Sequence, residues 1–174
     1  ASRSGPGSNS DEIIAGTRGV LGQVLEELGI RSILDVGCGD LHWIRNLDLS
    51  SVRYQGIDIV DALIAANTQA MQTAAEQCAG RAGAEAAAAQ ECARLPASFA
   101  FHVVDATRQI PRQICLPAPD AQAPGGGCEL VMIKEVLIHL TLNDAVHVVQ
   151  QVQGLAQAGY EEQRQERPKY LLAM

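Results

Sequence analysis

Two glycines and two aspartates stand at spacings suited to binding a ligand that contains a nucleoside. Gly37 and Gly39 form a G-x-G turn, in which the backbone can bend sharply and approach a ligand closely because glycine has no Cβ. Asp58 comes 19 residues after Gly39, near the spacing of about 20 residues at which a carboxylate binds ribose hydroxyls. Asp35 lies two residues before the first glycine. The pattern predicts a ligand site around this turn.

Glu135 and His139 are the candidates for acid–base chemistry. They are four residues apart, so on a helix they would share one face. That face would begin where an apolar run at 130–133 ends, beside the predicted ligand site. Either side chain could serve as a general base, and imidazole can accept a proton near neutral pH. The alternative is a local surface pair, or a His139 that only caps the helix end.

Apolar runs and helical stripes alternate along the chain, and together they would position these residues. Strands are predicted at 33–36, 52–57, 99–104, 130–133 and 170–174, and helices at 17–28, 61–79 and from about 144 to 156. The pattern Thr141-x-x-Asp144 is typical of a helix start. Residues 40–46 could open a further helix, whose first N–H groups would face the ligand. This order predicts an α/β fold, doubly wound, with a mostly parallel sheet and helices on both faces.

The length of 174 residues predicts one domain. Residues 1–16 are expected to form a flexible Gly/Ser-rich segment, and residues 17–174 to form the domain. Within it, the alanine-rich stretch near 79–97 is interpreted as a low-complexity insertion, and 111–127, which is rich in proline and glycine, as a long loop.

The charge and the cysteines of the sequence indicate which binding partners and which cellular compartment to expect. The net charge of −7, without a basic stripe, argues against nucleic acid or an anionic membrane as the main partner. The five cysteines are odd in number and lack a C-x-x-C pair, which argues against a disulfide framework or a zinc site and for a reducing compartment. The histidines are scattered, so no metal site is predicted. A cytoplasmic protein is expected, and its oligomeric state is left open.

Four motifs together resemble those of the class I methyltransferases that depend on S-adenosylmethionine (SAM). They are Leu34-Asp-Val-Gly-Cys-Gly-Asp-Leu-His-Trp43, Gly56-Ile-Asp-Ile59, Val103-Val-Asp-Ala-Thr107 and Lys134-Glu-Val-Leu-Ile-His-Leu140. The resemblance covers residues 30 to 174 and implies a Rossmann-like fold with SAM as cofactor. Similar enzymes have seven strands, whereas the last strand predicted here is the fifth. The resemblance therefore implies a fold that is incomplete at the C-terminus.

The resemblance also implies roles at the methionine end of the cofactor. Gly37 and Gly39 would lie under the methionine and ribose, with Cys38 as a small residue that fills the turn. Asp35 would help to hold the amino group, directly or through water. The backbone at Lys134 would approach the sulfonium. In the same way, Glu135 matches a position that is usually acidic in similar proteins.

At the adenosine end, the resemblance implies that Asp58 accepts both ribose hydroxyls and that Ile59 packs on adenine. Asp105 would accept the exocyclic amine of adenine, with Ala106 close to the ring. Local alternatives remain for both acids: Asp58 could cap a helix, and Asp105 could be an ordinary turn residue.

The leading hypothesis is thus a SAM-dependent methyltransferase with an unidentified, small-molecule acceptor. The alternative is a module that binds SAM or a nucleotide without turnover. An NAD-dependent oxidoreductase is disfavoured, because His42 stands where the third glycine of G-x-G-x-x-G is expected. Beside it, Trp43 could edge the cofactor pocket or simply pack in the core.

Overall fold

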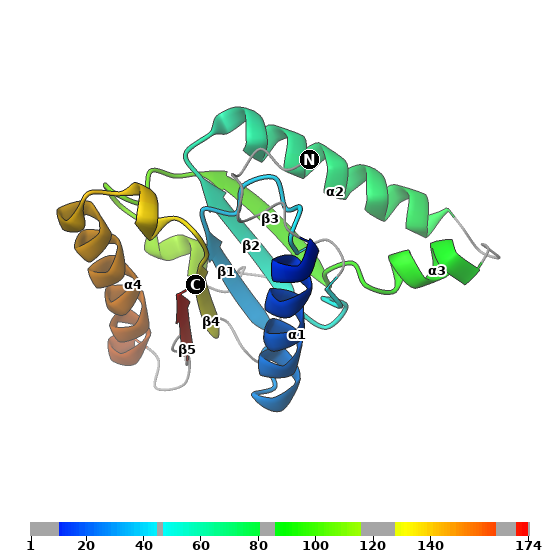
Figure 1. The fold of residues 1–174 in the computed structure, drawn as a ribbon, viewed down its shortest axis with the longest axis horizontal. Helices are drawn as coiled ribbons and strands as arrows, with labels where there is room; N and C mark the ends of the chain where they lie inside the picture. The colour runs from blue at the N-terminus through cyan, green and yellow to red at the C-terminus, as the bar shows by residue number, and fades with distance from the viewer. Residues whose placement is uncertain (1–10, 45–46, 81–85, 116–127, 163–169, 174) are drawn as a thin grey trace.

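The computed structural model describes residues 11–44, 47–80, 86–115, 128–162 and 170–173. Their strands form one five-stranded sheet in the order β3-β2-β1-β4-β5, and every strand pair in it is parallel (Figure 1). The strands are β1 (Ser32–Val36), β2 (Arg53–Asp58), β3 (Ser98–Val103), β4 (Leu130–Ile133) and β5 (Tyr170–Ala173). The predicted parallel sheet is confirmed, with strand ends within one or two residues of those expected.

Helices cover both faces of this sheet, which confirms the doubly wound α/β class. They are α1 (Asp11–Glu27), α2 (Asp61–Ala79), α3 (Ala86–Cys92) and α4 (Leu142–Glu162), with short 3₁₀ helices η2 (Arg112–Cys115) and η3 (Leu137–His139). Side chains of α1 and α2 join one hydrophobic cluster, and side chains of α4 join the other. Figure 1 shows α4 set apart from α1 and α2 by the sheet.

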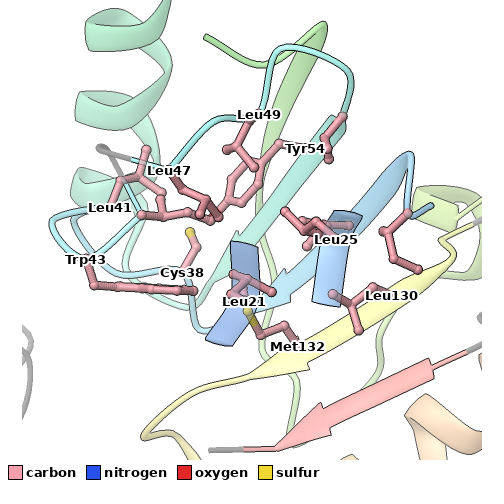
Figure 2. Packing of buried hydrophobic residues seen from close by; sticks show 14 of the residues in the cluster. Leu21, Leu25, Cys38, Leu41, Trp43, Leu47, Leu49, Tyr54, Leu130 and Met132 are labelled. Carbon is pink, nitrogen blue, oxygen red and sulfur yellow. The ribbon is translucent and has the colours of Figure 1, made fainter. Parts of the chain in front are cut away.

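The central strand β1 separates the two clusters. All five of its residues are buried, as expected for a strand covered on both faces of a parallel sheet. Ile33 belongs to the cluster under α1, whereas Leu34 and Val36 belong to the cluster under α4. This alternation follows from the two-residue repeat of a strand. Figure 2 shows the first cluster, in which Trp43 and Leu41, from the segment after β1, pack with side chains of α1 and the sheet.

The helix expected at 40–46 is absent from the part of this segment that the structure describes. Residues 40–44 form turns instead, and Leu41 has a φ of +59°, which a right-handed helix cannot contain. The Arg18 guanidinium of α1 donates to the carbonyls of Trp43 (2.6 Å) and His42 (3.1 Å). Because these carbonyls are bound by a side chain, the contact with α1 stabilises an irregular segment there.

Helix ends differ from the predictions in two other places. Helix α1 begins at Asp11, six residues before the predicted start, so 11–16 is helical; residues 1–10 of the expected flexible segment lie outside the described residues. Helix α4 runs to Glu162, six residues beyond its predicted end. Its predicted start is confirmed, since Asp144 N–H donates to the Thr141 hydroxyl (3.3 Å) and that hydroxyl donates to the Asp144 carboxylate (2.7 Å).

The expectation of unpaired cysteines is wrong. Cys78 is bonded to Cys92, and Cys115 to Cys128, with Cα atoms 5.5 and 4.9 Å apart, within the range that a disulfide requires. The folded backbone brings together residues whose sequence spacing suggested no pairing. Because disulfides persist in oxidising environments, the inference of a reducing compartment loses its basis. Cys38 is free and buried. No helix among the described residues is both long and apolar enough to cross a membrane.

Candidate cofactor site

A pocket of about 310 Å³ lies at the carboxyl ends of β1, β2 and β4 and beside the residues that follow β3. From β1 the strand order runs outward through β2 to β3, and β4 then lies on the other side of β1. Ligands of open α/β sheets bind at such a switch point, here between β1 and β4. Ten of the eleven residues predicted for the site line this pocket. They are Gly37, Cys38, Gly39, Asp58, Ile59, Asp105, Ala106, Lys134, Glu135 and His139.

The glycine turn has the backbone that its sequence predicts. Gly37 and Gly39 have φ values of +76° and +58°, a region that residues with a Cβ rarely adopt. The N–H groups of Gly37 and Cys38 both donate to the carbonyl of Ile57, at 2.8 and 3.0 Å, which fixes the end of β1 against β2. A Cβ on Gly37 would stand 2.2 Å from Cγ2 of Val136. The close approach of this valine therefore also requires glycine.

Asp58 holds the same turn from the other side. Its Oδ2 accepts the Gly39 N–H at 3.0 Å, and its Oδ1 accepts the Val60 N–H at 2.9 Å. A carboxylate has about four acceptor positions, so each oxygen can accept one more donor from the pocket. Helix α2 has Val60 as its N-cap residue, without a side-chain cap. The alternative that Asp58 caps this helix is therefore wrong.

The acid after β3 is held by its own turn. Asp105 Oδ1 accepts the Thr107 N–H at 3.0 Å and its hydroxyl at 2.5 Å, and Oδ2 lies 3.3 Å from Arg108 Nε. The Thr107 hydroxyl, with smaller effects of its N–H and of Arg108, lowers the pKa of Asp105. These contacts are those expected if Asp105 is an ordinary turn residue, which was the alternative to adenine binding. Asp105 nevertheless also lines the pocket. On the same wall Ile59 is 62% exposed, an apolar surface open to a ligand.

Asp35 is the one predicted residue that is not on the pocket wall. It is 1% exposed and lies on the same face of β1 as Ile33. The Tyr54 hydroxyl donates to its Oδ2 at 2.6 Å, while its Oδ1 has no hydrogen-bond partner among the described residues. Burial raises the pKa of Asp35 to about 7, against the lowering effect of the Tyr54 hydrogen bond. Asp35 thus lies behind the pocket rather than in it.

Lys134 is buried at the end of β4. Its Nζ lies 3.2 Å from Glu135 Oε1 and 5.8 Å from the centre of the Trp43 ring, and it has no hydrogen-bond partner among the described residues. Trp43 is both a core residue and a residue of the pocket wall. Its two predicted roles are therefore compatible.

Glu135 and His139 do not share a helix face, and the reasoning that paired them is wrong. Glu135 has a φ of +55°, and His139 ends the 3₁₀ helix η3, while the long helix begins only at Leu142. The left-handed residue turns the chain sharply after β4. Both side chains nevertheless reach the pocket wall.

Sequence reasoning missed Asn67, which supports the glycine turn. This residue of α2 is buried, and its Nδ2 donates to the carbonyl of Gly39 at 2.7 Å. A signal existed, because Asn67 continues the helical spacing of Ile64 and Met71, which pack in the core, and so is a polar residue on an apolar face. Burial, Asp35 and Asp58 raise the pKa of the Cys38 thiol above its usual range. Cys38 is therefore a small, protonated residue of the turn, not a nucleophile.

The fold and the pocket define a Rossmann-like α/β domain. No protein-family model and no curated protein sequence matches the chain significantly. Among solved structures, it is similar to the magnesium protoporphyrin IX methyltransferase of Synechocystis PCC 6803 with bound SAM (TM-score 0.48, 18% identity, 80% of this chain and 53% of that chain). It is also similar to the methyltransferase domain of bacterial CtHen1-C (0.49, 14%, 90% and 63%) and to the PH0226 protein of Pyrococcus horikoshii OT3 (0.49, 15%, 84% and 54%). The chain thus spans about half to three fifths of these structures.

Proposed function

We propose that the pocket binds SAM and that the protein transfers the methyl group to a small-molecule acceptor. The observation that carries this proposal is the contact between the ends of β1 and β2. There the Asp58 carboxylate accepts the Gly39 N–H and itself lines the pocket. A ribose bound there would lie over a turn without a Cβ at either glycine. Further along the same edge, Ile59 and Asp105 offer an apolar surface and a carboxylate suited to an adenine ring and its amine.

The connection after β1 favours SAM over a dinucleotide. Dinucleotide sites place the pyrophosphate on the N-terminus of the helix that follows the glycine turn. In this chain residues 37–44 form turns without a helix, and Arg18 binds two of their carbonyls. SAM has no pyrophosphate, so this end of the site requires no helix N-terminus.

The bound cofactor would supply a methyl group on a sulfonium, and the residues of this chain would mainly position the reactants. Holding two reactants in line can contribute several kcal/mol to catalysis. Carboxylates of Asp58, Asp105 and Glu135 on the wall favour a cationic ligand. An acceptor that must lose a proton would find His139 and Glu135 on the β4 side of the pocket, as candidates for the general base.

One observation favours the alternative of a binding module without turnover. The Glu135 carboxylate is 3.2 Å from Lys134 Nζ, so the group that would accept a proton is already engaged in an ion pair. In this alternative the pocket binds SAM or another nucleoside ligand, and His139 has no catalytic role.

Isothermal titration calorimetry with SAM, S-adenosylhomocysteine and NAD tests the binding step on this 174-residue chain. We expect the first two ligands to bind and NAD to bind much more weakly. A chain that binds NAD as tightly as SAM would contradict the proposal. Methyl acceptance from labelled SAM in a metabolite extract then tests turnover, and binding without any labelled product would favour the alternative.

A further inference from the structure

Two buried ionisable groups lie at the pocket, Lys134 on its wall and Asp35 behind it, and each has a polar atom without a hydrogen-bond partner among the described residues. These atoms are Lys134 Nζ and Asp35 Oδ1. Asp35 belongs to β1, and Lys134 directly follows β4, the neighbouring strand, in which Ile133 pairs with Val36. The exposed fraction is 5% for the Lys134 side chain and 1% for Asp35.

The Lys134 ammonium lies at ion-pair distance from Glu135, but it makes no hydrogen bond to any described residue. An ammonium has three donors, and a buried charge without hydrogen bonds is costly. Its neighbours are Glu135, which is half-buried and close enough for an ion pair, and the Trp43 ring. Both neighbours line the pocket, as does Lys134 itself. The ammonium therefore stands directly beside the pocket, with donors unused.

We propose that Lys134 binds the carboxylate of the methionine part of SAM, so that it selects ligands with an intact amino-acid end. This inference rests on the function proposed above and adds a residue that recognises one group of the ligand. A carboxylate is the acceptor that best matches a buried ammonium, because a charge-assisted hydrogen bond is about twice as strong as a neutral one. Asp35, behind the pocket wall, would favour the ligand's amino group electrostatically when it is ionised.

The electrostatics of the pair agree with this arrangement. Burial raises the pKa of Asp35, the Tyr54 hydrogen bond lowers it, Asp58 raises it further, and Lys134 has the smallest effect, which lowers it. The two side chains therefore act on each other, and above a pH of about 7, where Asp35 is ionised, they carry opposite charges. The amino-acid end of SAM is itself a zwitterion, with an ammonium and a carboxylate on one carbon. A ligand oriented so that its charges oppose those of Asp35 and Lys134 would compensate both.

The test compares SAM with decarboxylated SAM, which lacks only the carboxylate, on the wild type and on Lys134→Met. Calorimetry should show that the wild type binds SAM roughly 10- to 100-fold more tightly than the decarboxylated ligand. In Lys134→Met this preference should fall to about 2-fold or less, while the affinity for 5′-methylthioadenosine, which lacks the whole amino-acid end, stays within about 3-fold of the wild type. Arg112→Met is the control. Arg112 is exposed and is not on the pocket wall, so the preference should persist.

A wild type that binds both ligands equally well overturns the inference even if Lys134→Met fails to fold. The same holds for a folded Lys134→Met that keeps the full preference, since another group then holds the carboxylate. In both cases SAM still binds, so the proposed function survives. A wild type that binds neither SAM nor S-adenosylhomocysteine removes the proposed function and the inference with it.

Discussion

The two walls of the pocket are built in different ways. On the β1–β2 wall, polar groups are satisfied by backbone: Gly37 and Cys38 N–H bind the Ile57 carbonyl, and Asp58 binds the N–H groups of Gly39 and Val60. On the β4 wall, Lys134 is buried without a hydrogen-bond partner among the described residues, and Glu135 has a left-handed backbone.

The protein's own backbone therefore satisfies the hydrogen-bonding groups of the first wall, whereas the second wall contains a buried ammonium without a hydrogen bond to any described residue. Hydrogen bonds to the backbone fix the first wall as part of the fold, so its geometry is available before any ligand arrives. Buried polar groups without partners carry a free-energy cost, which a ligand could relieve on the second wall. We therefore expect changes in the first wall to affect folding and binding together, and changes in the second to affect recognition and chemistry.

The largest effect is expected from Gly37→Val. The Cβ of the new valine would lie 2.2 Å from Cγ2 of Val136. This β-branched residue would also have to adopt the φ of +76° that Gly37 has. SAM binding should be abolished, and the free energy of unfolding should fall by roughly 3 kcal/mol or more. Calorimetry and urea denaturation measure the two effects. Gly154→Val is the control, since a Cβ there has no neighbour within 4 Å; normal SAM affinity in Gly37→Val would show that this turn is not the cofactor cradle.

The next largest effect tests the β4 wall. If His139 is the general base, His139→Ala should lower turnover by roughly 10²- to 10⁴-fold with little change in SAM affinity. The readout is the rate of methyl transfer to any acceptor identified in the extract. His147→Ala is the matched control, because His147 is exposed and is not on the pocket wall. Full activity of His139→Ala would leave His139 without a catalytic role, and a larger loss in Glu135→Gln would make Glu135 the base.

The third largest effect, that of Asp58→Ala, tests the β1–β2 wall. Loss of the hydrogen bonds that two ribose hydroxyls would donate to the carboxylate should weaken SAM binding by roughly 2–3 kcal/mol. Asp58→Asn should lose less, because its amide oxygen still accepts a hydrogen bond. Asp61→Ala, at an exposed acid outside the pocket wall, should bind SAM normally. An unchanged calorimetric affinity in folded Asp58→Ala would refute the ribose contact.

The smallest expected effect is a pH dependence of stability caused by Asp35. Its pKa is about 7 in the folded state and about 3.9 in an unfolded chain, so between these values the folded state binds more protons. Stability should therefore fall as the pH rises through this window and level off above it, by roughly 2 kcal/mol between about pH 5.5 and 8. The side chain of Asp35→Asn cannot ionise, so the stability of this variant in urea denaturation should not show this fall with pH. If wild type and variant have the same pH profile of stability, Asp35 is not the cause.

Local patterns in the sequence were enough to predict most of the fold. Apolar runs located the five described strands, and Thr141 with Asp144 located the start of α4, because hydrophobic periodicity and helix capping are local properties. The spacing from Gly39 to Asp58 likewise predicted two groups that are in contact through a hydrogen bond. Neighbouring parallel strands bring their carboxyl ends to one edge of the sheet, so short motifs there meet in space.

Other features depend on contacts between distant segments, and the sequence pattern gave wrong answers for them. The segment 40–44 has turns rather than a helix because Arg18, more than 20 positions earlier, binds its carbonyls. The two disulfides depend on backbone paths that return the chain to within 6 Å.

The sequence by itself determined the identity and order of the pocket's residues, since glycines and acids placed at the ends of apolar runs must gather at one edge of a parallel sheet. Only the tertiary structure decided which of them reach the pocket. The alternation of β1 places Asp35 behind the turn, against Tyr54, and the left-handed backbone of Glu135 takes the chain away from the expected helix. Burial and chain direction are set by packing across the whole sheet, and a local pattern of residue types does not contain that information.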